Sequence, residues 1–177
     1  PTCHYVMGGI PTTVNGQVLS DNTTVVPGLY AAGECACVSV HGANRLGTNS
    51  LLDINVFGRR AGIAAANYAL GHDFVELPEN PAGMVAGWVG DILSDHGNER
   101  VADIRGALQQ SMDNNAAVFR TEETLKQALT DIHALKERYS RITVHDKGKR
   151  YNSDLLEAIE LGFLLDLAEV TVAGALN

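Results

Sequence analysis

Two prolines near the middle of the chain separate two segments of different composition. Pro78 and Pro81 both lie in the short sequence LPENP. Proline fixes φ and has no backbone N–H, so regular structure is expected to stop there. The residues before this segment are rich in Gly and β-branched side chains, whereas those after it carry long helical patterns. We therefore predict two domains, residues 1–78 and 79–177, and an α+β fold.

Short extended segments and turns alternate in the first part of the chain. Gly16 is a turn signal between segments expected to be extended, around Thr12–Val14 and Gln17–Leu19. A short apolar strand is then expected over Leu29–Glu34, where it ends in a glycine and an acid.

A helix is predicted from Asn49 to about Leu70, with Asn49 or Ser50 as its N-cap. Its apolar side chains cover nearly the whole circumference, and such a helix is normally buried. The sequence therefore predicts short strands packed around a buried helix. The apolar residues in question are Leu51, Leu52, Ile54, Val56, Phe57 and Ile63.

The second part of the chain is predicted to be helical almost throughout. Apolar residues repeat with helical spacing in residues 84–93, 101–112 and 125–139, and each repeat indicates one buried face. Thr121 is expected to cap the third helix and Ser153 the fourth. Amphipathic helices with short connections predict an antiparallel bundle. No clear C-cap signal follows the last helix, so we expect a bundle truncated at its C-terminal end, in an internal-to-C-terminal segment of a longer protein.

Composition excludes several classes of function. The net charge of −8 argues against nucleic acid as a partner, because phosphate binding needs a basic surface. No segment approaches the ~20 apolar residues that a membrane span needs. The most apolar late stretch, residues 155–176, is interrupted by four acidic side chains.

The cysteines do not indicate a disulfide framework or a metal site. Cys3, Cys35 and Cys37 make an odd number, which favours a reducing compartment. The Cys-x-Cys spacing does not suit the usual zinc pair, and no second pair completes four ligands. We predict buried or half-buried free thiols and no metal.

The segment His41–Asp53, HGANRLGTNSLLD, can bind an anion beside a helix terminus. The planar fork of Arg45 suits a carboxylate, although an isolated loop arginine is more often a solvated surface residue. The helix opened by Asn49 and Ser50 begins with N–H groups that have no partner within the helix and carry partial positive charge. The alternative is an ordinary capped helix with no ligand.

Two further residues could contact a ligand. Glu34 follows a short apolar strand, where an acid can accept hydrogen bonds from ligand hydroxyls or simply cap the next turn. His4 lies in HYVMGG and could also contact a ligand. The alternative role for His4 is an ordinary polar contact or a surface position. For His41 we favour a structural role or the support of a neighbouring ligand-binding residue, and the remaining histidines are assigned no role.

Taken together, three motifs resemble the flavoprotein subunit of succinate dehydrogenase and its fumarate reductase relatives. They are HYVMGG at His4–Gly9, GLYAAGE at Gly28–Glu34, and HGANRLGTNSLLD. The likeness extends over the whole chain and is sharp in residues 1–60. L-aspartate oxidases are the nearest competitor. Met7, and the sequence RLGTN that begins at Arg45, favour the succinate and fumarate branch.

This resemblance implies FAD as the cofactor and a dicarboxylate as the substrate. Glu34 would hold the ribityl chain, and the start of the helix would face the flavin ring, stabilise its anionic reduced form and raise its potential. His4 and Arg45 would each bind a substrate carboxylate. No catalytic residue is assigned within this chain. The cofactor-binding residues implied are Glu34, Asn49, Ser50 and Leu51.

The resemblance also implies a fold and its missing parts. Residues 1–78 would be the C-terminal part of a two-dinucleotide-binding FAD domain, and residues 79–177 the helical domain that follows it. The sequence contains no G-x-G-x-x-G, so the strand and helix that hold the FAD pyrophosphate are expected upstream. The histidine that carries FAD covalently and the arginine proton shuttle are expected there too. The isolated chain is therefore expected to be inactive.

The parent protein is expected to oxidise succinate to fumarate by hydride transfer to FAD, as part of the tricarboxylic acid cycle and electron transport. Electrons would pass to an iron–sulfur subunit and quinone. Membrane anchor subunits would hold the complex at the cytoplasmic face of the inner or cytoplasmic membrane, without a membrane span in this chain. The alternatives are a fumarate reductase or L-aspartate oxidase, or a non-catalytic helical interaction domain.

Overall fold

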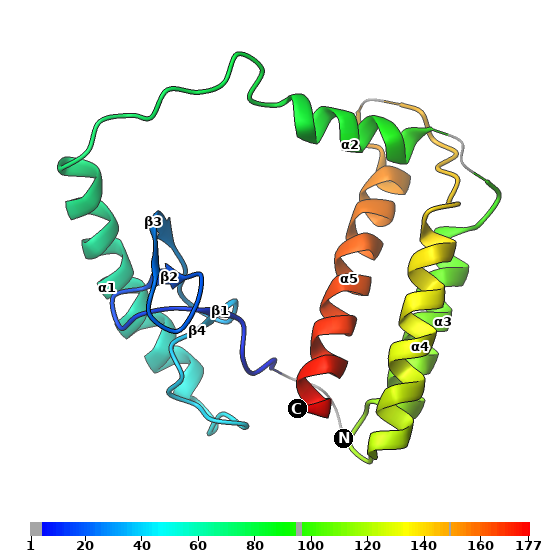
Figure 1. Cartoon of the computed structure of the whole chain (residues 1–177), viewed down its shortest axis with the longest axis horizontal. Coiled ribbons are helices and arrows are strands. Elements are labelled where there is room, and N and C mark those ends of the chain that lie inside the picture. The colour runs from blue at the N-terminus through cyan, green and yellow to red at the C-terminus, as the bar shows by residue number, and fades with distance from the viewer. Residues whose placement is uncertain (1–4, 95–96, 149) are drawn as a thin grey trace. The chain divides into compact units, whose positions relative to one another are not determined.

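The computed structural model describes residues 5–94, 97–148 and 150–177. The chain is α+β and divides into two compact units, Pro1–Glu76 and Leu77–Asn177, called here the strand unit and the helical unit. Figure 1 shows the elements of each unit along the chain. The domain boundary predicted between residues 78 and 79 stays a prediction.

From residue 5 onward, the strand unit contains two short two-stranded sheets. β1 (Ile10–Pro11) pairs in parallel with β4 (Ala36–Cys37). β2 (Gln17–Leu19) pairs antiparallel with β3 (Val25–Tyr30), with a register irregularity between Gln17 and Leu19. The strand predicted at residues 17–19 is confirmed.

The two neighbouring strand predictions need correction. The segment expected around Thr12–Val14 pairs only at Thr12, which forms an isolated bridge with Val18. A tight turn begins directly after it, because the Gly16 N–H donates to the carbonyl of Thr13 at 2.9 Å. The strand expected over Leu29–Glu34 ends at Tyr30.

Two glycines allow close backbone approaches within the strand unit. Gly9 has φ +125°, and a Cβ atom there would lie 2.5 Å from the carbonyl oxygen of Cys35. Gly16 has φ +73°, and its Cβ would lie 2.4 Å from the Cβ of Ala61. Both positions therefore need glycine, for conformation and for space. The second contact places the turn before β2 against the helix that contains Ala61.

The predicted helix of the strand unit is confirmed as α1 (Asn49–Leu70), which packs against β3. The predictions of its cap and of its burial are wrong. The N-cap is Thr48, and within α1 only Asp53 and Ala61 are buried. β3 packs against one side of this 22-residue helix, and much of the helix's apolar circumference stays uncovered. The exposed apolar residues of α1 include Leu51, Leu52, Ile54, Val56 and Ile63.

The described part of the helical unit contains four helices, as its patterns predict. They are α2 (Gly83–Leu93), α3 (Val101–Asn115), α4 (Glu122–Tyr139) and α5 (Ser153–Leu176).

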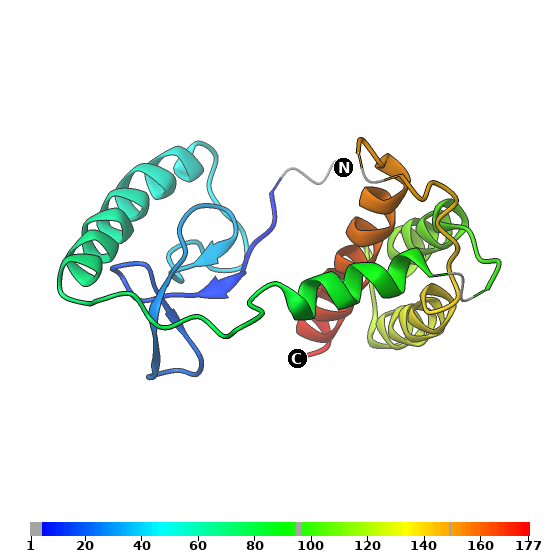
Figure 2. The same cartoon turned by 90° about the horizontal axis from the view of Figure 1, so that it is seen from above.

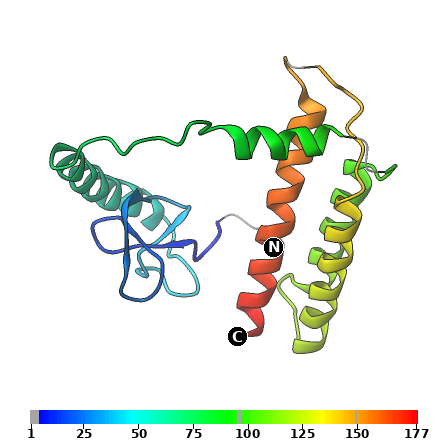
Figure 3. The ribbon, with the colours of Figure 1, turned by 45° about the horizontal axis from the view of Figure 1, so that its top comes forward.

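Three of these helices lie side by side and alternate in direction, with α4 packed against both α3 and α5 (Figures 1 and 3). α2 lies across α5, as the view from above shows (Figure 2). At that crossing the ring centroids of Trp88 and Phe163 are 5.9 Å apart.

One continuous hydrophobic core fills the helical unit. Each of α3, α4 and α5 contributes a buried stripe at helical spacing, and the segment after α4 adds Ile142 and Val144. No helix in the described ranges is long and apolar enough to cross a bilayer. The largest fully buried side chains are Ile104, Ile132, Val144, Leu161, Leu165 and Val172.

The helix caps of this unit agree with one prediction and correct another. Thr121 caps α4 in a reciprocal arrangement with Thr124, as predicted. Ser153 is not a cap, because it is already the first helical residue. The side chain of Asn152, one position earlier, accepts a hydrogen bond from the Leu155 N–H at 2.8 Å.

Candidate functional site

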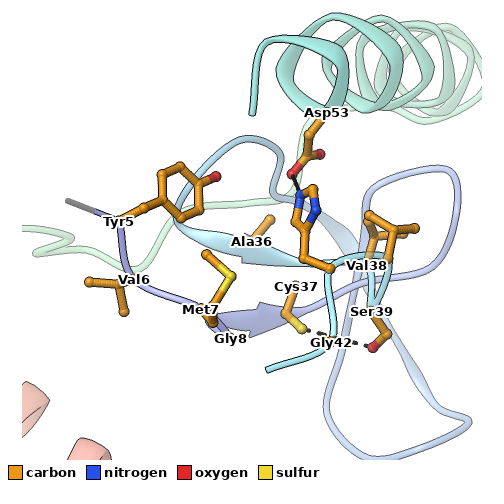
Figure 4. Close-up of a pocket in the computed structure, with 12 residues that line it drawn as sticks. Tyr5, Val6, Met7, Gly8, Ala36, Cys37, Val38, Ser39, Gly42 and Asp53 are labelled. Atoms are coloured by element: carbon orange, nitrogen blue, oxygen red, sulfur yellow. Dashed lines mark hydrogen bonds and ion pairs between the residues drawn. The ribbon is translucent and has the colours of Figure 1, made fainter. Parts of the chain in front are cut away.

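A cavity of about 170 Å³ lies in the strand unit, among the motif segments that the sequence singles out. Residues 5–8 form one wall and residues 36–42 another, while Asp53 reaches the cavity from α1 (Figure 4). The HYVMGG and HGANRLGTNSLLD motifs, far apart in the sequence, therefore meet at one place.

A partly buried pair joins the loop after β4 to α1. His41 Nε2 lies 2.8 Å from Asp53 Oδ2, and the two side chains are 17% and 7% exposed. A dashed line in Figure 4 marks this contact. Because Asp53 belongs to a helix and His41 to a loop, the pair fixes the beginning of that loop. This agrees with the structural role favoured for His41.

The guanidinium of Arg45 stacks on the ring of Tyr5. Its central carbon lies 4.1 Å from the ring centroid, within the range of a cation–π contact. Nη1 donates to the carbonyl of the adjacent Leu46 at 3.3 Å. Nε is buried and has no hydrogen-bond partner among the described residues. A buried, unused donor on a cation is costly, and an anionic ligand would satisfy it.

Tyr5 stays neutral in this environment. Burial raises the pKa of its phenol, and the nearby carboxylates of Asp53 and Glu34 raise it further, while Arg45 acts in the opposite direction. Tyr5 therefore presents an uncharged aromatic face to the arginine.

Glu34 lies in a turn rather than at a strand end. The turn is closed by the Ala36 N–H, which donates to the carbonyl of Gly33 at 2.9 Å. Glu34 Oε1 accepts a hydrogen bond from the Val6 N–H at 3.1 Å. The acid thus contacts the segment that carries Tyr5, and its side chain remains exposed.

The first turn of α1 keeps at least one free donor. Thr48 adopts a left-handed conformation with φ +68°, and its side chain caps nothing. The Leu51 N–H donates to the Thr48 carbonyl at 3.0 Å, whereas no described residue accepts a hydrogen bond from the Ser50 N–H. Ser50 is half-buried and Leu51 is 61% exposed. Such a terminus can donate to an electron-rich ligand.

Of the residues predicted to bind ligands, the structure places Glu34 and Arg45 beside Tyr5. Asn49, Ser50 and Leu51 form the first turn of the helix that follows the Arg45 loop. His4 lies outside the described residues.

Two residues of this cluster were missed in the sequence. Tyr5 could have been found as an aromatic neighbour of His4 inside HYVMGG. Asp53 could have been found as the single acid within the apolar run SLLDINVF. Among the cysteines, Cys37 is half-buried, but the prediction of a buried or half-buried thiol fails at Cys35, which is exposed.

Comparison with known proteins finds two matching family models and similar flavoproteins. Residues 1–51 match the FAD binding domain family, and residues 105–177 match the family described as fumarate reductase flavoprotein C-term. A Rickettsia bellii succinate dehydrogenase flavoprotein subunit is 47% identical over 99% of this chain. The chain is similar to the flavoprotein subunits of succinate dehydrogenase and fumarate reductase. FAD is the cofactor that these matches indicate.

Other flavoproteins are similar to this chain in sequence and in fold. A Mycobacterium tuberculosis fumarate reductase flavoprotein subunit is 40% identical over the whole of this chain. Mycobacterium smegmatis Sdh1 in complex with UQ1 has a TM-score of 0.89 at 36% identity, over 99% of this chain and 28% of that one. FrdA of E. coli quinol fumarate reductase has a TM-score of 0.88 at 36% identity, over 99% and 29%. The chain spans about 30% of the length of the curated relatives.

Proposed function

We propose that this chain is part of an FAD-dependent succinate dehydrogenase flavoprotein subunit, which oxidises succinate to fumarate. The observation that carries the proposal is the buried, unpartnered Nε of Arg45, a few residues before the uncapped start of α1. An anion-binding donor and a helix terminus with a free N–H then lie within one short segment.

Arg45 is proposed to bind one carboxylate of the substrate. Its guanidinium would donate in parallel to two carboxylate oxygens. By the family resemblance, His4 would bind the other carboxylate. Two fixed carboxylates orient the methylene carbons between them, and such orientation lowers the barrier to the transfer.

The proposed cofactor-binding residues are Glu34, Asn49, Ser50 and Leu51. FAD supplies the hydride acceptor when it is bound. The free N–H of Ser50, at the positive end of the α1 dipole, would donate to the flavin ring and favour its reduced, anionic form. Glu34, exposed and in a turn, would accept hydrogen bonds from the ribityl hydroxyls.

Residues 1–78 are proposed to be the C-terminal part of a two-dinucleotide-binding FAD domain, and residues 79–177 a helical bundle domain. The exposed apolar face of α1 supports the first assignment, since the remaining sheet of such a domain would cover it. The chain lacks a G-x-G-x-x-G motif, so on its own we expect it to purify without flavin absorption.

The proposed partners are an iron–sulfur subunit and membrane anchor subunits that pass electrons to quinone. The complex would lie at the cytoplasmic face of the inner or cytoplasmic membrane, with this subunit peripheral. The names of the relatives, which are flavoprotein subunits, support the proposal.

The test is Arg45→Ala in the full-length flavoprotein. We expect succinate turnover to be lost while FAD remains bound, because Arg45 contacts the substrate and not the phosphates of the cofactor. Turnover and flavin absorption are measured on the same preparation. Arg59→Ala removes an exposed arginine from α1 and is the matched control. If Arg45→Ala turns over succinate as the wild type does, Arg45 does not bind the substrate.

Fumarate reduction is the second candidate, because a fumarate reductase subunit is 40% identical to this chain. Both reactions use the same residues in opposite directions. Steady-state rates of succinate oxidation and of fumarate reduction, measured on one preparation, decide which direction is faster.

A further inference from the structure

The loop that carries Arg45 is held by few contacts. In the described ranges, Arg45 Nη1 and the Asn49 N–H both donate to the carbonyl of Leu46, inside the loop itself. The His41–Asp53 pair fixes the beginning of the loop, four residues before Arg45. Among the described residues, the ring of Tyr5 contacts the guanidinium from outside the loop.

This contact fixes the plane of the guanidinium. A cation above an aromatic face is attracted by the ring quadrupole, so the planar group is stacked rather than hydrogen-bonded. Stacking uses none of the N–H donors, and Nε stays unpartnered. An arginine ordered before the ligand arrives loses less conformational freedom on binding.

Tyr5 is itself held in place. Its side chain lines the cavity, as that of Asp53 does (Figure 4). The N–H of the next residue, Val6, donates to Glu34 Oε1 at 3.1 Å. The raised pKa of its phenol keeps the ring neutral at physiological pH. The tyrosine is thus a fixed, uncharged surface for the arginine.

We propose that Tyr5 is a positioning residue, whose ring orients Arg45 for a dicarboxylate substrate. The proposal rests on the proposed function, because it assumes that Arg45 binds a carboxylate. It assigns Tyr5 no contact with the substrate or with the reacting atoms.

The experiment compares Tyr5→Leu, which removes the ring, with Tyr5→Phe, which keeps it, in the full-length flavoprotein. Malonate, a dicarboxylate that cannot be oxidised in the same way, is the probe, and its Kd is measured by calorimetry. We expect Tyr5→Leu to raise the malonate Kd and the KM for succinate about tenfold, with kcat changed less than about threefold. For Tyr5→Phe, the malonate Kd and the KM for succinate should both stay within about threefold of the wild-type values.

Tyr68→Leu is the matched structural control. Tyr68 packs against Tyr30 and His72 in the same unit, and no contact joins it to Arg45 in the described chain. This variant loses ring packing, so a merely structural effect would appear in it as well. We expect its malonate Kd to match that of the wild type.

Three outcomes would overturn the proposal. They are an unchanged malonate Kd in Tyr5→Leu, an equal loss in Tyr5→Phe, or loss of FAD from Tyr5→Leu. The double variant with Arg45→Ala gives a further test, since Tyr5→Leu should then have no additional effect on the Kd. If Arg45→Ala alone binds malonate normally, the proposed substrate site is wrong instead, and the two failures are distinguishable.

Discussion

The two units of this chain are stabilised in different ways. The helical unit has one continuous core, supplied by α3, α4 and α5 and the segment after α4. In the described part of the strand unit, the buried apolar residues are Val18 and Ala61. The candidate site thus lies in the unit with the smaller core. Glycine contacts, an aromatic–arginine stack and a partly buried histidine–aspartate pair hold the strand unit instead of a large apolar core.

The largest expected effect tests the core of the helical unit. Leu161→Ala removes a fully buried side chain from α5 and should lower the free energy of unfolding by about 3 kcal/mol. Leu167→Ala, on the same helix but 63% exposed, should change it by less than about 0.5 kcal/mol. Urea unfolding followed by circular dichroism measures both. Equal losses of unfolding free energy in the two variants would show that Leu161 does not lie in the core.

A second prediction tests the backbone contacts of the strand unit. Gly16→Ala places a Cβ against Ala61 at positive φ and should cost about 2 kcal/mol locally. Gly58→Ala is the control, because Gly58 lies within α1 with open space around it and alanine favours the helix. Hydrogen exchange of peptides from each unit reports the local opening free energies. Unchanged protection in Gly16→Ala would contradict the close contact with α1.

A third prediction concerns the polar pair that fixes the Arg45 loop. Asp53→Ala removes the partner of His41 and should weaken local protection around residues 38–48 by about 1.5 kcal/mol. The helical unit should be unaffected. Asp73→Ala, at an exposed position after α1, is the control. Faster exchange throughout α1, rather than in the loop, would mean that Asp53 stabilises the helix instead.

The smallest expected effect is a pH dependence confined to the helical unit. Hydrogen bonding from Arg138 lowers the pKa of Glu99 from its ordinary 4.5, and the charges of Arg138 and Arg141 add to this. The carboxylate therefore stabilises the folded state fully above pH 4.5, and this contribution is lost as the pH falls through the lower, folded-state pKa.

Glu99→Gln should make unfolding less sensitive to pH between about pH 5 and pH 3. Urea midpoints across that range measure the effect. Glu79→Gln, at an exposed position, serves as the comparison and should follow the wild-type curve. If the urea midpoint of Glu99→Gln falls with pH as steeply as that of the wild type, the Glu99–Arg138 contact does not contribute to the acid sensitivity of this unit.

Local patterns predicted the helical unit well. Apolar spacing predicted α2, α3 and α4, and a polar cap signal predicted α5. Thr121 caps α4, as expected of a threonine that precedes two acidic residues. The miss at Ser153 is one residue, because Asn152 is an equally good cap and the sequence alone does not choose between adjacent polar residues.

The strand unit was predicted less well, for a physical reason. An apolar helix predicts burial, but burial depends on what covers the helix, and β3 leaves much of α1 uncovered. The strand expected to reach Glu34 stops at Tyr30 because the chain turns before β4. Short strands are set by their partners, which local sequence does not specify.

The sequence by itself determined the family motifs, the candidate ligand-binding residues and the positions of the helices, because helical spacing and motif chemistry are local. The tertiary structure alone decided that Tyr5 stacks on Arg45, that Asp53 pairs with His41, and that Glu34 bonds to Val6. These contacts join residues 12 to 40 positions apart, and only folding brings them within a few ångströms.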